Sequence, residues 1–91
     1  METLIIKAKE QKSKFGRTYL IYKNGRKEVA RISYPMEGTK EGYCASVNTS
    51  RTGGITWGTH PTIEKPKATA EEFILNVYSI YNKQIVFQYL Q

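Results

Sequence analysis

The chain has 91 residues, a net charge of +6 and 40% hydrophobic residues, which fit one folded domain over residues 1–91 and exclude a disordered basic tail. All eight acidic residues are Glu, and His60 and Cys44 are the single histidine and cysteine, so a Ser–His–Asp triad, a two-histidine metal site and an internal disulfide are excluded. One cysteine, no apolar run of membrane-spanning length and no signal-peptide pattern in the first residues indicate a cytoplasmic protein.

The first predicted strand covers Thr3–Lys9, where β-branched and alternating residues follow one another. The polar, basic stretch Glu10–Gly16 is expected to be a loop. The most specific local signal comes next, because Asn24-Gly25 lies between two strand-like runs, Arg17–Lys23 and Arg26–Tyr34. Asn-Gly suits the positive φ angles of a type I′ turn and predicts a β-hairpin.

A two-residue turn at Asn24-Gly25 also predicts which side chains share a face. Lys23 would lie opposite Arg26, and Tyr22 would lie opposite Lys27. The face expected to join the core holds Tyr19, Ile21, Ala30, Ile32 and Tyr34. The face expected to be half-exposed holds Thr18, Leu20, Tyr22, Lys27, Val29, Arg31 and Ser33.

After the hairpin, Pro35 ends the strand because proline cannot donate to a strand ladder. Alternation returns over Tyr43–Asn48, which predicts a fourth strand, and Ile55–Trp57 is a candidate for a short fifth one. The stretch Gly58–Lys67 contains two prolines and is expected to be an irregular crossing.

A helix is predicted from Thr69, because Thr69-Ala70-Glu71-Glu72 has the pattern of a capping box and apolar residues follow at helical spacing. This helix would end at Asn82 or Lys83, and Gln84–Leu90 would form a final strand. The order β-β-β-β-(β)-α-β predicts an α+β fold, an antiparallel sheet of four or five strands with one helix packed on one face.

The positive charge is concentrated in one part of the chain. From Lys7 to Arg31 there are nine Lys or Arg residues against Glu10 and Glu28, a net charge of +7. A localised basic field on a sheet with aromatic residues is typical of a surface that binds a polyanion. Like charges at Lys23 and Arg26 would destabilise a hairpin slightly, which favours a functional role for them. Edge protection and solubility are the alternative explanation for each charge taken alone.

Three further features have two interpretations each. Phe15 could stack on a base or pack in the core. The segment Arg51-Thr52-Gly53-Gly54 offers a cation and amides to an oxyanion, although turn geometry also explains its glycines. Trp57 and His60 could stack on bases or belong to the core. The predicted nucleic-acid-binding residues are Lys7, Lys9, Lys12, Lys14, Phe15, Arg17, Tyr22, Lys23, Arg26, Lys27, Arg31 and Arg51.

These features predict a non-enzymatic protein that binds nucleic acid, either RNA or another single strand, and that has no metal, cofactor or membrane partner. The predicted helix begins with glutamates, a poor fit to a DNA major groove, which disfavours duplex readout. The alternative is a small inhibitor or antitoxin-like protein, of the general type found in phages and mobile elements, that binds a host nuclease or ribonucleoprotein. A metal-independent ribonuclease using His60 is the least supported hypothesis, because nothing in the spacing brings a second acid–base group to it.

Overall fold

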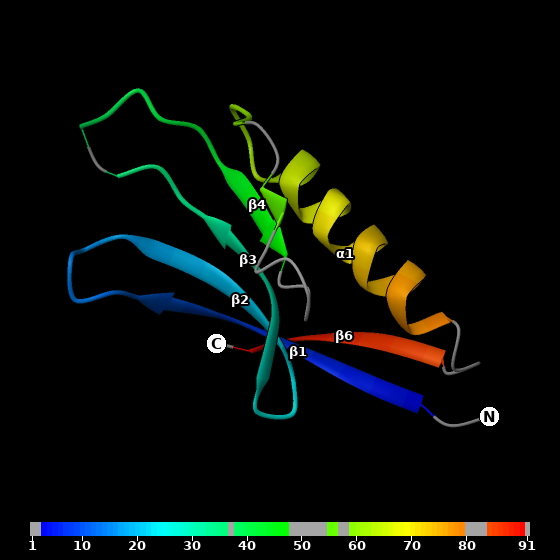
Figure 1. The fold of residues 1–91 in the computed structure, drawn as a ribbon. Coiled ribbons are helices and arrows are strands. Elements are labelled where there is room, and N and C mark those ends of the chain that lie inside the picture. Colours follow the sequence, from blue (N-terminus) through cyan, green and yellow to red (C-terminus); the bar gives the residue numbers. More distant parts are fainter. Residues whose placement is uncertain (1–2, 37, 48–54, 57–58, 80–83, 91) are drawn as a thin grey trace.

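The computed structural model of the chain describes residues 3–36, 38–47, 55–56, 59–79 and 84–90 (Figure 1). In chain order the elements are β1 (Thr3–Lys12), β2 (Thr18–Asn24), β3 (Lys27–Ser33), β4 (Cys44–Val47), β5 (Ile55–Thr56), α1 (Glu64–Ser79) and β6 (Gln84–Leu90). This order, with one helix on one face of a mostly antiparallel sheet, confirms the predicted α+β fold. Trp57 and the predicted helix end at Asn82 or Lys83 lie outside the described residues.

The sheet has six strands among the described residues, in the order β5-β4-β3-β2-β1-β6. Strands β1 to β5 pair antiparallel with their neighbours, whereas β6 runs parallel to β1 and brings the sheet to one strand more than predicted. Parallel pairing requires a long crossover, and α1 forms part of it as it crosses over β3 and β4 before the chain reaches β6 (Figure 1).

The core lies between α1 and the sheet, and Tyr22 is its largest fully buried side chain. Tyr22 pairs with Ala8 of β1 on one side and with Ala30 of β3 on the other, so two small side chains leave room for its ring. The buried cluster consists of Ile6, Ala8, Leu20, Tyr22, Val29, Ala30, Ile32, Ala45, Val47, Ala70 and Ile74.

The predicted hairpin is present, but its register differs from the prediction. Asn24 pairs with Lys27, so Gly25 and Arg26 form the turn, and Gly25 has a positive φ of 64°. The register then shifts between Tyr22 and Lys23, an irregularity of the β-bulge type. Tyr22 therefore pairs with Ala30 rather than with Lys27.

The shift decides which side chains of β2 reach the core. Because side chains alternate along a strand, a one-residue change of register exchanges the two faces. Leu20 and Tyr22 lie in the core cluster and Tyr19 is only half-buried outside it, so the predicted faces of these three residues are wrong. Ile21 is buried as predicted, at 7% exposed, but it lies outside that cluster, on the opposite face of the sheet. On β3, downstream of the shift, Ala30 and Ile32 are buried as predicted.

The helix begins at Glu64, about one and a half turns before the predicted start at Thr69. The Lys67 N–H donates to the Ile63 carbonyl at 2.9 Å, which is the first helical bond. Pro66 lies in the first turn, where an amide has no helical acceptor and a missing N–H costs little. Thr69 is therefore inside the helix, and the predicted capping box is wrong.

Candidate nucleic-acid interface

The face of the sheet that α1 does not cover carries a cluster of charged side chains. Registers of β1, β2 and β3 place three residues in one row, Lys7, Lys23 and Glu28. The next row contains Lys9, Ile21 and Arg31, and the row after it contains Gln11, Tyr19 and Ser33. We call these nine residues the open face. It holds four cations and one carboxylate, a net charge of +3.

The pair of like charges lies between β1 and β2, not within the predicted β2–β3 hairpin. Lys23 pairs with Glu28 across the β2–β3 ladder, so the predicted opposition of Lys23 and Arg26 is wrong. Lys7 of β1 is the like-charged partner, because it pairs directly with Lys23 of β2. Two cations directly opposite each other on neighbouring strands slightly destabilise the pairing of those strands.

Two contacts position Arg31 on the open face. Its Nε and Nη2 atoms donate to the two carboxylate oxygens of Glu28 at 2.7 and 2.6 Å, and this pairing raises the pKa of Arg31. Its guanidinium also lies 4.9 Å from the centroid of the Tyr19 ring. A planar cation on an aromatic ring is a surface on which a base can stack. Arg31 is thus partly neutralised by Glu28 and better placed for stacking than for a phosphate contact.

The loop between β1 and β2 presents an aromatic side chain to solvent. The Ser13 N–H donates to the Arg17 carbonyl at 2.8 Å and the Gly16 N–H donates to the Ser13 carbonyl at 3.0 Å, which close a tight loop. Gly16 has a φ of 91°, a conformation that favours glycine. Phe15 at this tip is 79% exposed, so it does not pack in the core, and the Lys14 ammonium lies 5.5 Å from its ring centroid.

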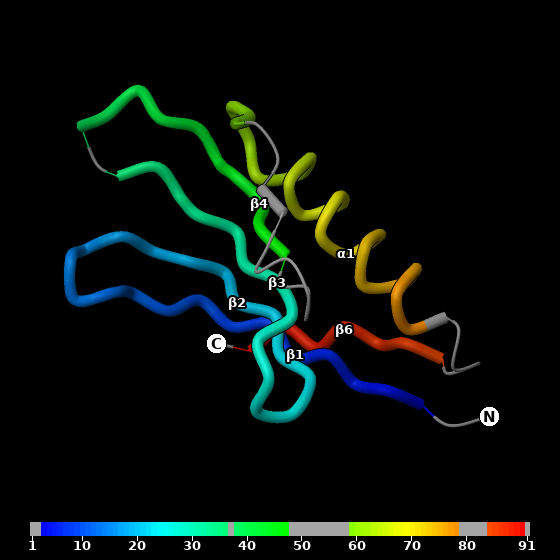
Figure 2. Tube along the Cα trace, in the orientation of Figure 1, coloured from blue at the N-terminus to red at the C-terminus, as the bar shows by residue number. Residues whose placement is uncertain are grey.

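Figure 2 shows the β1–β2 hairpin extending past the part of the sheet that α1 covers. The predicted site residues of this hairpin do not all lie on one surface. Lys12 pairs with Thr18 at the end of the β1–β2 ladder. Because it follows Gln11 of the open face and side chains alternate, Lys12 lies on the opposite face. Arg17 donates to the Tyr34 carbonyl at 3.1 Å and to the Glu41 carboxylate at 2.8 Å, which ties it to the β3–β4 connection.

Tyr22 was predicted as the exposed stacking residue, and this prediction is wrong. Its side chain is fully buried beneath α1, and its hydroxyl donates to the Glu71 carboxylate at 2.9 Å. Burial and the Glu71 charge raise the pKa of Tyr22. Tyr89 donates to the same carboxylate oxygen at 2.5 Å, so β2, α1 and β6 meet at one polar network. On β2, Tyr19 rather than Tyr22 lies on the open face. The sequence alone does not distinguish the two tyrosines, because their faces depend on the register shift between Tyr22 and Lys23.

The remaining predicted residues lie at the edges of this surface. Arg26 and Lys27 are exposed at the β2–β3 turn, and Lys27 pairs with Asn24, whose amide donates to the Tyr78 hydroxyl of α1 at 3.4 Å. Lys27 therefore does not share a face with Arg31, contrary to prediction. Arg51 lies outside the described residues.

His60 is fixed by its backbone. Its N–H and carbonyl pair with those of Tyr43 at 2.9 and 2.7 Å, and its side chain is half-buried. A Cβ atom added to Gly42 would lie 2.5 Å from the His60 carbonyl oxygen, so the close approach of these backbones requires glycine at that position. His60 is on the β4 side of the sheet, away from the lysines of β1.

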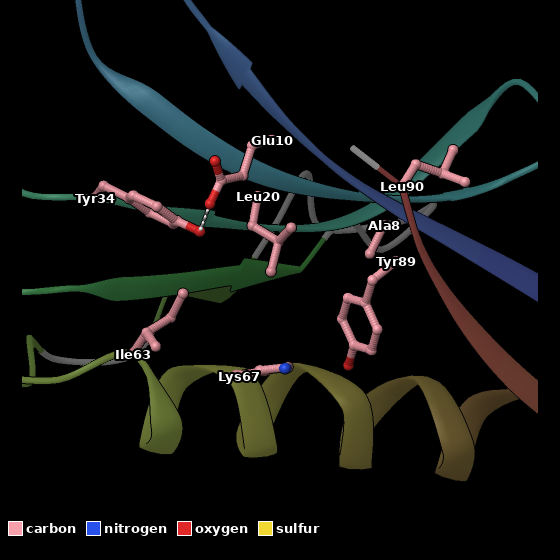
Figure 3. Close-up of a pocket in the computed structure, with 8 residues that line it drawn as sticks. All are labelled: Ala8, Glu10, Leu20, Tyr34, Ile63, Lys67, Tyr89 and Leu90. Carbon is pink, nitrogen blue, oxygen red and sulfur yellow. Dashed lines mark hydrogen bonds between the residues drawn. The ribbon is translucent and has the colours of Figure 1, made fainter.

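A pocket of about 570 Å³ lies on the other side of the sheet, beneath the N-terminal half of α1 (Figure 3). Tyr34 donates to the Glu10 carboxylate at 2.9 Å, and the Lys67 ammonium lies 4.2 Å from the Tyr89 ring centroid. The residues that line the pocket are Ala8, Glu10, Leu20, Tyr34, Ile63, Lys67, Tyr89 and Leu90. With one cation, one carboxylate and mostly apolar walls, this pocket is a poor match to a polyanion.

No family model matches the chain, and no curated protein or solved structure is significantly similar to it. In the described ranges, no helix is long and apolar enough to cross a membrane. The same residues contain no group of three or more potential metal ligands. Function is therefore inferred from the open face and the hairpin tip.

Proposed function

We propose that this protein binds RNA or another single-stranded nucleic acid on its open face, without catalysing a reaction. The observation that carries the proposal is the direct pairing of Lys7 with Lys23, beside Lys9 on the same strand. Such a group of cations is unfavourable for the isolated protein and favourable once phosphates neutralise it.

The shape of the surface favours a single strand over a duplex. The cations lie on a sheet, and α1, the helix of the described chain, covers the opposite face and begins with Glu64. A helix in that position cannot enter a major groove from the cationic side. Proteins that read single strands on sheets combine backbone contacts with stacking on aromatic or Arg planes, and here Tyr19 with Arg31 and the exposed Phe15 supply such planes.

The composition of the open face supports a binding role rather than catalysis. Its titratable groups are Lys, Arg, Tyr and one carboxylate, and that carboxylate is bonded to Arg31. General acid–base catalysis of strand cleavage needs two groups positioned on the reacting atoms, and the one carboxylate of this face is engaged by Arg31 instead. A cytoplasmic location is part of the proposal and is supported by the single cysteine, Cys44.

The test is a titration of a labelled single-stranded RNA of about 12 nucleotides, a length that spans one small binding site. Anisotropy would be measured at several salt concentrations from about 50 to about 200 mM. The double variant Lys7→Gln/Lys9→Gln should bind more weakly and reduce the log–log salt slope by ~0.7 for each lost contact. The matched control is Lys40→Gln/Lys65→Gln, which removes the same charge from two exposed positions outside the open face.

Equal weakening by the two double variants would mean that net charge alone, not the open face, attracts RNA. Absence of binding by the parent protein at low salt would refute the proposal. The inhibitor-like alternative, with a nuclease or ribonucleoprotein as partner, would then take its place. A duplex of the same length, titrated in parallel, checks the preference for single strands.

A further inference from the structure

Strand β6 forms an edge of the sheet that a further strand can extend. All seven of its residues pair with β1, from Thr3–Gln84 to Lys9–Leu90. No other strand of the described chain pairs with its outer side. An unpaired row of backbone N–H and carbonyl groups is a template for another strand.

The residues of β6 lack the usual protection of an edge. Gln84–Leu90 contains no charged residue and no proline, whereas its neighbour β1 alternates lysines with apolar residues. Val86, Tyr89 and Leu90 are 42%, 46% and 37% exposed, and Ile5, which pairs with Val86, is 48% exposed. Long, uncharged and apolar edges of this kind associate with other strands unless they are covered.

We propose that β6 pairs antiparallel with β6 of a second copy of this chain, about a two-fold axis at Phe87. Ile85 would then face Tyr89 of the second copy, and Val86 would face Gln88. Each pair joins residues of the same face, Ile85 with Tyr89 on the helix side and Val86 with Gln88 on the open side, because side chains alternate in both strands. The sheet would continue without a break through both copies.

A second copy fits this edge better than an acidic or basic partner strand, because β6 offers no charge for such a partner to pair with. The aromatic residues also meet suitable partners, since Phe87 would face itself and aromatic cross-strand pairs stabilise antiparallel sheets. Helix α1 packs mainly over β3 and β4 and contacts β6 more sparsely, and it lies on one face of the sheet rather than along the outer side of β6 (Figure 1).

The positive charge of the chain sets how this pairing depends on salt. Lys7 and Lys9 of one copy would be separated from those of the other by at least three strand spacings, about 14 Å or more. This distance exceeds the screening length of about 8 Å at physiological ionic strength, so their repulsion matters mainly at low salt. Dimerisation should therefore strengthen as salt rises, opposite to the binding of nucleic acid, and the two proposals can fail independently.

The experiment is sedimentation equilibrium over a wide range of protein concentration, at low salt and at physiological ionic strength. Val86→Lys places a charge on the edge and should raise the dimer dissociation constant by about tenfold or more. Gln11→Lys is the matched control, because it adds the same charge to the same face beyond the end of the β1–β6 ladder, and it should change that constant by no more than about twofold.

Gln88→Lys serves as a second edge variant, and circular dichroism of each variant shows whether it is folded. Amide hydrogen exchange should show protection of β6 that increases with protein concentration in the parent and in Gln11→Lys, but not in Val86→Lys. A parent protein that stays monomeric at its highest concentration and physiological ionic strength would overturn the proposal. A dimer that both edge variants leave unchanged would also overturn it.

Discussion

The two faces of the sheet are built from the same strands but treat polar groups in opposite ways. On the face under α1, one carboxylate oxygen of Glu71 accepts hydrogen bonds from Tyr22 and Tyr89, so the buried Tyr22 hydroxyl has an acceptor. On the open face, Lys7 lies beside another cation, Lys23. Side-chain burial explains the first arrangement, whereas the second is slightly unfavourable by itself and is offset, under the proposed function, by the phosphates of a bound strand.

The sharpest test of this comparison is a pair of tyrosine substitutions on the same strand. Tyr22→Ala should lower the free energy of unfolding by roughly 3–5 kcal/mol, because a large buried ring leaves a cavity. Tyr19→Ala should cost only about 0.5–1 kcal/mol, since it removes one partly exposed contact with Arg31. Urea unfolding of both variants measures the difference.

The reverse order of these two effects would restore the predicted register, with Tyr22 exposed and Tyr19 in the core. Titration of single-stranded RNA adds a second readout, because Tyr19→Ala should weaken binding while remaining folded. Unaltered RNA affinity in that variant would remove Tyr19 from the proposed interface.

The sequence predicts the order of the elements because each has a local signal, such as the alternation over Thr3–Lys9 or the uncharged run Gln84–Leu90. It does not predict the register shift beside Tyr22, because a tyrosine in the core depends on Glu71, 49 residues away, as the acceptor for its hydroxyl. The same dependence on register applies to the candidate site. Lys7, Lys9, Lys23 and Arg31 can be selected from charge alone, whereas choosing Tyr19 over its neighbour requires the three-dimensional register.

The helix start shows the same dependence on context. Pro66 looks like a helix breaker in the sequence, yet it is harmless in a first turn and is fully buried there. Thr69 has the features of a cap residue, but the bond from Lys67 to Ile63 extends the helix past it. Pro66 and Thr69 are both compatible with a helix start, and the packing of the segment before Thr69 decides where the helix begins.

The polar network under α1 gives the next largest effect. Glu71→Ala should destabilise the protein by about 1–3 kcal/mol, because it leaves the buried Tyr22 hydroxyl without its acceptor. Glu72→Ala, an exposed neighbour of the same type, should stay within about 0.5 kcal/mol of the parent. Thermal or urea unfolding distinguishes them, and equal losses in the two variants would mean that helix charge, not the network, is responsible.

The hairpin tip should affect binding without affecting stability. Phe15→Ala should weaken the binding of single-stranded RNA by about 1–3 kcal/mol if a base stacks on the ring, with little change in the salt slope. Its melting temperature should match that of the parent, because the ring is 79% exposed. Met36→Ala, which removes an exposed apolar side chain from a different loop, is the control. Unchanged affinity in Phe15→Ala would confine the interface to the open face.

Alkaline pH should act on the covered face through Tyr89. Burial, with the Glu71 contact, raises the pKa of Tyr89 to about 12. An unfolded tyrosine loses its proton near pH 10, so between about pH 10 and 12 the unfolded state binds fewer protons. The stabilisation is complete below this window and is lost as pH rises through it.

Urea unfolding of the parent and of Tyr89→Phe, below and within that window, measures the contribution of this one group. The comparison of the two proteins is the test, rather than the decline itself, because it isolates the contribution of this one hydroxyl. The decline should be shallower in Tyr89→Phe, and only modestly so because Tyr89 is 46% exposed. Parallel curves would mean that its hydroxyl does not stabilise the fold.

The smallest expected effect concerns the start of α1, which fixes how much of the sheet is covered. Because Thr69 lies inside the helix, Thr69→Ala should leave the free energy of unfolding unchanged or raise it by up to ~0.7 kcal/mol, since alanine has the higher helix propensity. A loss of ~1 kcal/mol is the result expected of a cap residue. Thermal unfolding separates these signs. Such a loss would move the helix start to Thr69 and leave Ile63 and Lys67, which line the pocket beneath α1, without a helix to position them.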